Sequence, residues 1–206
     1  MSHAYLTHWF AFACPWLALL WCLQFVGGWC GLKNGWLRIA LPGLAAAGLL
    51  ALPVQGFPMA LWVAGLNANF SIPLNGLLAV AVWEKAFSRK YFTAQDCLAA
   101  SGFGVVAGLV LYPLALGFGK FDPYEWGWAF SGLFVVIAAL TGWLIWKKNR
   151  FGLLLLLAIM AWHLRLLESA NYWDYLLDPV YFFVSIIALG GRLAARLRRR
   201  DAKVQR

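Results

Sequence analysis

The side chains best suited to chemistry gather in one stretch of the sequence, after residue 160. His163, Arg165 and Glu168 lie close together in the run AWHLRLLE. A histidine near a carboxylate can exchange protons at neutral pH, and an arginine can bind an anionic headgroup through parallel hydrogen bonds. The candidate catalytic residues are therefore His163, Glu168 and Asp174, and the candidate substrate-binding residues are Arg165, Glu125, Asn171, Trp173 and Asn75.

The expected depth of His163 in a membrane sets this group apart. On a helix that begins near Phe151, His163 lies about 18 Å from the helix start, in the outer half of a hydrocarbon core about 30 Å thick. Ionisable groups at such depth are costly unless they pair or face a wet cavity. Arg165 and Glu168 are expected to pair on one helix face. Two interpretations stay open: an outward-facing polar pocket that binds a substrate, or a salt-bridged outer rim that only ties loops together.

Uncharged polar residues around Pro73 offer a different site. Asn67, Asn69, Ser71 and Asn75 flank this proline. A membrane span that is interrupted by proline and carries uncharged polar groups can line the binding site of a transporter. These residues support a small-solute carrier as an alternative function.

Signals for a metal or a cofactor are missing from the sequence. No pair of histidines has the H-x-x-x-H spacing that places two zinc ligands on one helix, and none of the 4 cysteines belongs to a C-x-x-C pair. His3 and His8, both expected outside, do not converge on one helix face. A P-loop and a G-x-S-x-G motif are also absent. We expect no metal and no cofactor, and the sequence does not decide whether the protein is an enzyme.

The composition decides the class of protein. Of the 206 residues, 63% are hydrophobic and 12% are charged, and the mean hydropathy is +0.72. Soluble domains have about 45–50% apolar and about 25% charged residues. We therefore expect an all-α integral membrane protein, a single bundle of seven transmembrane helices. The expected spans are 5–26, 36–53, 71–87, 94–116, 123–146, 151–167 and 179–197, with a short interfacial stretch over 57–66.

The basic residues set the expected orientation. If the N-terminus is outside, all of the 17 lysines and arginines except Lys120 and Arg165 fall on the cytoplasmic side, as the positive-inside rule requires. We expect the N-terminus out, the C-terminus in, a transmembrane domain over 1–197 and a basic cytoplasmic tail over 198–206. Such a tail is typical of an anchor beside anionic lipid headgroups. The short loops favour a bacterial inner membrane, and no nucleic-acid module accompanies the tail.

Several polar residues have local structural explanations. Asp122 and Asp178 are each followed by proline. We expect them to be the N-cap residues of two helices that begin at the outer face. Thr93 and Asp96 resemble a capping box. The G-x-x-x-G pattern over 104–108 is typical of close helix packing.

Together these features predict a polytopic plasma-membrane protein whose outward-facing polar pocket handles a lipid or a lipid-linked amphiphile. Membrane lipids are the expected partners, and other membrane subunits are further candidates. Two alternatives stay open: a small-solute transporter, and a non-catalytic accessory subunit of a larger membrane complex.

Overall fold

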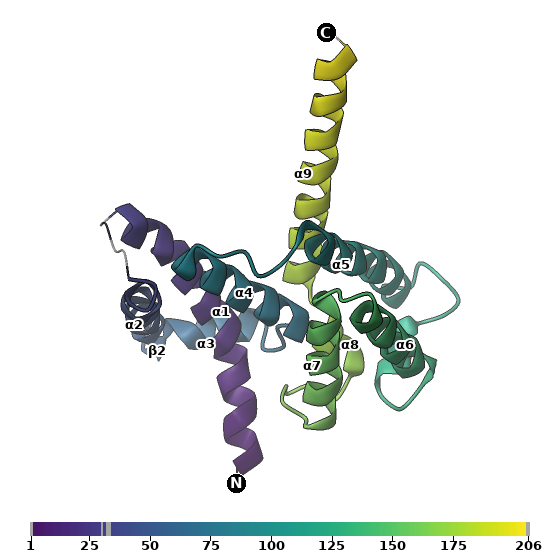
Figure 1. The fold of residues 1–206 in the computed structure, drawn as a ribbon. Coiled ribbons are helices and arrows are strands. Elements are labelled where there is room, and N and C mark those ends of the chain that lie inside the picture. Colours follow the sequence, from purple (N-terminus) through teal and green to yellow (C-terminus); the bar gives the residue numbers. More distant parts are fainter. Residues whose placement is uncertain (1, 30, 32–33, 205–206) are drawn as a thin grey trace.

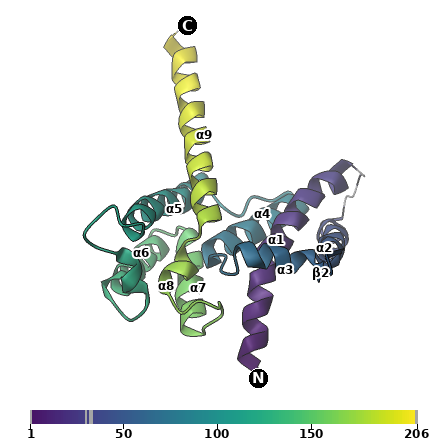
Figure 2. The same cartoon turned by 180° about the vertical axis from the view of Figure 1, so that it is seen from behind.

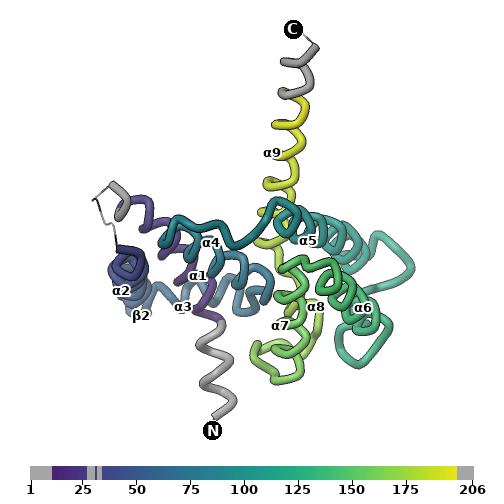
Figure 3. The backbone as a smooth tube through the Cα atoms, in the orientation of Figure 1, coloured from purple at the N-terminus to yellow at the C-terminus, as the bar shows by residue number. Residues whose placement is uncertain are grey.

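The computed structural model describes the backbone of residues 2–29, 31 and 34–204 (Figure 1) and the side chains of 11–26, 31 and 34–198 (Figure 3). The side chains of His3 and His8 therefore lie outside the described residues. Over the described backbone the regular secondary structure consists of helices and one short hairpin. The expected all-α class is confirmed.

Short connections join the helices. In chain order they are α1 (Ser2–Trp29), α2 (Leu37–Ala51), α3 (Met59–Leu66), α4 (Ile72–Phe87), α5 (Ala94–Ala115), the 3-10 helix η1 (Pro123–Gly127), α6 (Gly132–Trp146), α7 (Phe151–His163), α8 (Tyr172–Leu176) and α9 (Pro179–Val204). The hairpin pairs β1 (Pro53–Val54) with β2 (Phe57–Pro58) through a turn at Gln55 and Gly56, where both residues have positive φ. The expected interfacial stretch over 57–66 thus contains β2 and the short helix α3.

The helices lie in two groups that meet where α4 contacts α7 (Figure 1). In the first group α1 packs on α2, α3 and α4, and in the second α6 packs on α7. Helix α9 packs on α5 near its own N-terminus and then extends away from both groups, as the view from behind also shows (Figure 2). Much of α9 is therefore left without a neighbour among the described helices.

The main core lies where α4 to α9 meet. Phe151, Leu155 and Tyr175 are completely buried there. A smaller core joins α1, α2 and α4 around Leu20 and Ala46. Burial of these apolar side chains stabilises the packing of the helices within each core.

Glycines let α5 and α9 approach closely, as the sequence predicts. A Cβ atom at Gly104 would collide with Ser185, and one at Gly108 would collide with the ring of Phe182. The G-x-x-x-G pattern is therefore part of the α5–α9 interface.

The expected span over 123–146 is wrong at its first part. The chain forms η1, leaves the helical conformation after Gly127 and begins α6 only at Gly132. Ser131 explains the break: its hydroxyl accepts a hydrogen bond from the Leu133 N–H at 3.3 Å and donates one to the Trp126 carbonyl at 2.6 Å. Ser131 is thus the N-cap of α6, and Asp122 caps only η1, through the Tyr124 N–H.

Helix length limits how many spans the structure supports. Among the described residues, Ala94–Ala115 and Pro179–Arg198 are long and apolar enough to cross a membrane. Helices α2 and α6 have 15 residues each and α7 has 13, so they reach about 20–22 Å, short of a core about 30 Å thick. The expected seven-helix membrane bundle is therefore not confirmed.

The capping box is confirmed at the start of α5. The Thr93 N–H donates to the Asp96 carboxylate at 2.8 Å, and the Asp96 N–H donates to the Thr93 hydroxyl at 3.2 Å. The second Asp96 oxygen accepts the Arg150 N–H at 2.8 Å. One carboxylate therefore caps α5 and fixes the loop between α6 and α7.

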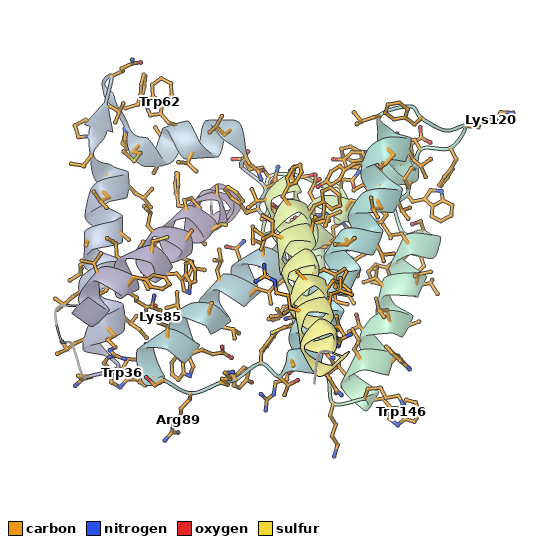
Figure 4. The ribbon with its side chains drawn as sticks, turned by 90° about the horizontal axis from the view of Figure 1, so that it is seen from above. Trp36, Trp62, Lys85, Arg89, Lys120 and Trp146 are labelled. Atoms are coloured by element: carbon orange, nitrogen blue, oxygen red, sulfur yellow. The ribbon has the colours of Figure 1, made fainter. Side chains whose placement is uncertain are left out.

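The loops gather at two opposite edges of the molecule. Figure 4 shows Trp36, Arg89 and Trp146 at one edge and Trp62 and Lys120 at the other. We call these the Arg89 edge and the Lys120 edge. The three loops at the Arg89 edge are those that the sequence analysis expects on the cytoplasmic side.

Candidate functional site

The expected cluster at the end of α7 does not form a buried group. Helix α7 ends at His163, and Arg165 takes a left-handed conformation with φ 53°. The Arg165 N–H bonds to the Trp162 carbonyl at 3.1 Å and the Leu166 N–H bonds to the Ala161 carbonyl at 3.1 Å, which is a Schellman ending. The sequence predicts that Arg165 and Glu168 share one helix face, and this is wrong, because the helix ends at His163 before both residues.

Side chains of this cluster point to solvent or to their own loop. His163, Arg165 and Glu168 are exposed. The Arg165 guanidinium donates to the Ala170 carbonyl at 3.0 Å and lies 5.3 Å from the Trp162 ring. It therefore holds the loop before α8 through a backbone carbonyl.

Asn171 and Trp173 hold α8 against η1. Asn171 is fully buried; its side chain accepts from the Trp173 N–H at 3.0 Å and donates to the Tyr124 carbonyl at 2.9 Å. The Trp173 indole donates to the Pro123 carbonyl at 2.8 Å. Their polar groups are used within the fold, and Glu125 is exposed on η1, so none of the three lines the cavity described below.

Asn75 lies inside α4 and is also separate from that cavity. Its side-chain N–H group donates to the carbonyls of Phe70 and Ser71, at 3.2 and 3.0 Å. Its side-chain oxygen is buried and has no hydrogen-bond partner among the described residues. Asn75 is thus tied to the first turn of its own helix.

A polar cavity of about 370 Å³ opens between the end of α5, η1 and the segment that joins α8 to α9. Two of its lining residues are close in sequence to labelled residues of the Lys120 edge: Asn67 comes five residues after Trp62, and Ala115 comes five residues before Lys120 (Figure 4). The polar lining comprises Asn67, Asn69, Tyr112, Tyr124, Asp174 and Asp178, and the apolar lining comprises Leu111, Ala115, Leu177 and Pro179.

Asp174 is the titratable group that this cavity makes available. The Tyr124 hydroxyl donates to the Asp174 carboxylate at 3.0 Å. Burial raises the pKa of the Asp174 carboxyl above its usual range, and hydrogen bonds from Ser169 and Tyr124 oppose this only in part. Burial, together with the neighbouring Asp174 charge, raises the pKa of Tyr124 to about 12. Tyr124 therefore stays a hydrogen-bond donor at neutral pH, and the Asp174 carboxyl is easier to protonate than an exposed aspartate.

Asp178 has a structural role that the sequence predicts in part. It is buried, and its two oxygens accept the Tyr181 N–H at 3.0 Å and the Ser71 N–H at 2.9 Å. It thus caps α9, as expected, and also fixes Ser71, the N-cap residue of α4. One carboxylate lies where the positive ends of two helix dipoles meet.

The other polar groups complete a lining without any basic side chain. Asn69 accepts the Ser169 N–H at 3.2 Å, and Asn67 accepts the Asn69 N–H at 3.0 Å. The Tyr112 hydroxyl is buried and has no hydrogen-bond partner among the described residues. Because the lining holds carboxylates and amides but no lysine or arginine, it suits a ligand that donates hydrogen bonds, such as a hydroxylated or ammonium headgroup.

Three of these lining residues are among the candidates that the sequence predicts. Asp174 comes from the first group of candidates, and Asn67 and Asn69 come from the carrier alternative. Tyr112 and Tyr124 are missed, because a tyrosine in an aromatic-rich chain carries no distinguishing signal. The one local signal near Tyr124 is the Asp122-Pro123 pair that directly precedes it and predicts a helix start. Among the described residues no group of three or more His, Cys, Asp or Glu side chains could hold a metal ion.

Comparison of the chain with protein-family models, curated proteins and solved structures finds no match. The function proposed below therefore rests on the chain's own residues.

Proposed function

We propose that the protein is a polytopic protein of the plasma membrane, as in a bacterial inner membrane, whose helices together make a seven-span bundle. Exposed apolar side chains on several helices support this proposal: Leu44 on α2, Val136 on α6 and Ile187 on α9 are 70%, 62% and 74% exposed. Large exposed apolar areas are typical of membrane-facing or protein-facing surfaces rather than of surfaces in contact with water. Local bilayer thinning and flanking residues whose side chains reach the interface would let the shorter helices match the membrane.

The polar cavity at the Lys120 edge faces outward in this proposal. Positively charged loops at the opposite Arg89 edge favour the cytoplasmic side. The cavity then binds the polar head of a lipid or lipid-linked amphiphile, with Leu111, Ala115 and Leu177 beside the apolar part. The single observation that carries the proposal is the Asp174–Tyr124 pair, which shares a cavity with an unpartnered Tyr112 hydroxyl.

Asp174 is the proton-exchanging group of the proposed site. Tyr124 stays protonated and orients the Asp174 carboxylate through its hydroxyl. A headgroup that donates a hydrogen bond to this carboxylate would stabilise its charged form. His163 and Glu168 lie outside the cavity lining, so the sequence-based hypothesis that they catalyse is tested against this one.

Carriage of a small solute is the second candidate function. The observation that favours it is that Asn67 and Asn69, selected for a carrier, line the same cavity as Asp174. A role as an accessory subunit would instead rest on the exposed apolar helix faces alone.

Mass spectrometry of amphiphiles that co-purify with the protein from its native membrane tests the site. We expect Asp174→Asn and Asn67→Leu to retain at least about tenfold less bound amphiphile than the wild type, because each removes a polar contact in a desolvated site. His163→Gln is the matched control, since His163 is exposed and outside the lining.

Three results would contradict the proposal. Equal amounts of amphiphile in all variants would remove the cavity as its site. Loss in His163→Gln alone would move the site to the end of α7. Asn67-dependent uptake of a solute by proteoliposomes, with no bound amphiphile, would favour the carrier.

A further inference from the structure

A second cavity, of about 260 Å³, lies between the first turns of α5 and the middle of α9. Its lining includes Ala94 and Leu98 from α5 and Leu189, Arg192, Leu193 and Arg196 from α9. It thus combines two guanidinium groups with apolar side chains, and it is separate from the polar cavity at the Lys120 edge.

We propose that this second cavity binds the phosphate of an anionic phospholipid between Arg192 and Arg196. The proposal rests on the membrane location proposed above, but not on the outer cavity or its ligand. The shared chemistry is a phosphate group, and the attached acyl chains are what distinguish a lipid from a free phosphate ion.

The two arginines lie on one side of α9, one helical turn apart, which is about 6 Å along the helix axis. Like charges at this spacing repel one another, whereas an anion between them would be bound by both. The Arg192 Nη1 atom is buried and makes no hydrogen bond to any described residue. A guanidinium with a desolvated, unpartnered nitrogen is costly, and charge-assisted hydrogen bonds from its other N–H groups to a phosphate would offset that cost.

The nearest acidic side chain on α5 cannot serve as this anion. Both oxygens of the Asp96 carboxylate are used, by the backbone and hydroxyl of Thr93 and by the Arg150 N–H. The backbone at the start of α5 adds the positive end of its helix dipole to the same cavity.

The apolar lining identifies a lipid as the source of the phosphate. Leu98 and Leu193 are 41% and 53% exposed, so they offer apolar surface directly beside the arginines. An acyl chain would cover such surface, whereas an inorganic ion would leave it in contact with water. Ala94, which lines the cavity, comes five residues after Arg89 in the sequence. The Arg89 edge is where anionic headgroups of the cytoplasmic leaflet are expected.

Native mass spectrometry of the full-length protein with added phosphatidylglycerol or phosphatidylcholine tests the proposal. We expect wild type to retain phosphatidylglycerol in preference to phosphatidylcholine. We expect Arg192→Gln combined with Arg196→Gln to reduce phosphatidylglycerol retention at least about tenfold, since two charge-assisted contacts are lost. Arg89→Gln is the matched control, because it removes an exposed charge at the same edge but outside the cavity.

Either of two lipid results would overturn the proposal: equal retention of both lipids by wild type, or unchanged phosphatidylglycerol retention in the double variant. Displacement of the bound lipid by inorganic phosphate would overturn the assignment to a lipid. If the double variant does not fold, Arg196→Gln alone tests the site, because Arg196 is exposed. Retention by the outer-cavity variant Asp174→Asn should be unchanged, which separates this proposal from the preceding one.

Discussion

Two aspartates four residues apart serve opposite purposes because their surroundings differ. Asp178 accepts two backbone N–H groups and is fixed by them. Asp174 accepts the Tyr124 hydroxyl, and burial raises the pKa of its carboxyl. The two carboxylates thus differ in their partners: backbone N–H groups for Asp178, and a side-chain hydroxyl in a buried setting for Asp174. Asp178 is therefore a structural residue, and Asp174 is the aspartate that we propose as an acid or base.

Asp174→Asn is expected to raise the melting temperature of the purified protein by a few degrees at pH 7. Because folding raises the pKa of Asp174 above its ordinary value of 3.8, the stability gained from its protonated form is lost as pH rises through the folded pKa. The asparagine amide does not ionise, so the variant keeps this stability at pH 7. The difference in melting temperature between the variant and wild type should therefore shrink as pH falls toward 3.8. Thermal unfolding at several pH values measures it. The exposed Glu125→Gln is the control, and equal wild-type and Asp174→Asn melting at pH 7 would refute the expectation.

At this scale the sequence identifies residue types better than their roles. Asn171 and Trp173 are polar or amphipathic residues near Asp174, but their polar groups bond to η1. The Tyr124–Asp174 contact joins positions 50 residues apart. No local pattern encodes such a contact, because it depends on how η1 packs on α8.

At the scale of elements, helix starts are better predicted than helix ends. The start of α5 follows from its capping box. Helices α4, α6 and α7 end near residues with positive φ that are not glycine, namely Ser88, Lys148 and Arg165. Glycine is the usual signal for a left-handed helix ending. Without a glycine there, the apolar run that begins at Phe151 predicts a helix as far as residue 167.

Gly104→Ala is expected to destabilise the protein by about 1–3 kcal/mol, the usual effect of overpacking, since its methyl group would meet Ser185 across the α5–α9 interface. Gly102→Ala in the same helix is the matched control: nothing lies within 4 Å of its added Cβ, and replacing a helical glycine stabilises by about 0.5–1 kcal/mol. Unfolding in detergent, followed by circular dichroism, measures both. Equal stability of the two variants would mean that α5 and α9 do not pack closely at Gly104.

For the whole molecule, charge distribution and helix length give different information. The loops expected on one side of the membrane do share one edge (Figure 4). Within the part of the chain that the structure describes, helix length and hydropathy together nevertheless support two spans, Ala94–Ala115 and Pro179–Arg198. Hydropathy cannot foresee this, because it averages over Ser131 and Arg165, where single polar contacts end or restart a helix.

Cysteine labelling of intact cells tests the two edges in a cysteine-free background. Lys120→Cys is expected to react with a membrane-impermeant maleimide from outside, while Arg89→Cys and Trp146→Cys should react only after the membrane is opened, because basic loops stay cytoplasmic. The last two variants control each other, since both lie at the Arg89 edge. Labelling of Lys120→Cys and Arg89→Cys from the same side would show that the two edges do not face opposite compartments.

The bond between the Ser71 N–H and Asp178 links positions 107 residues apart. During synthesis, α4 leaves the ribosome long before its distant carboxylate partner exists. The bond that anchors the start of α4 can therefore form only after residue 178 has been translated. A nascent chain that stops before residue 178 would leave the Ser71 N–H at the start of α4 without this carboxylate acceptor.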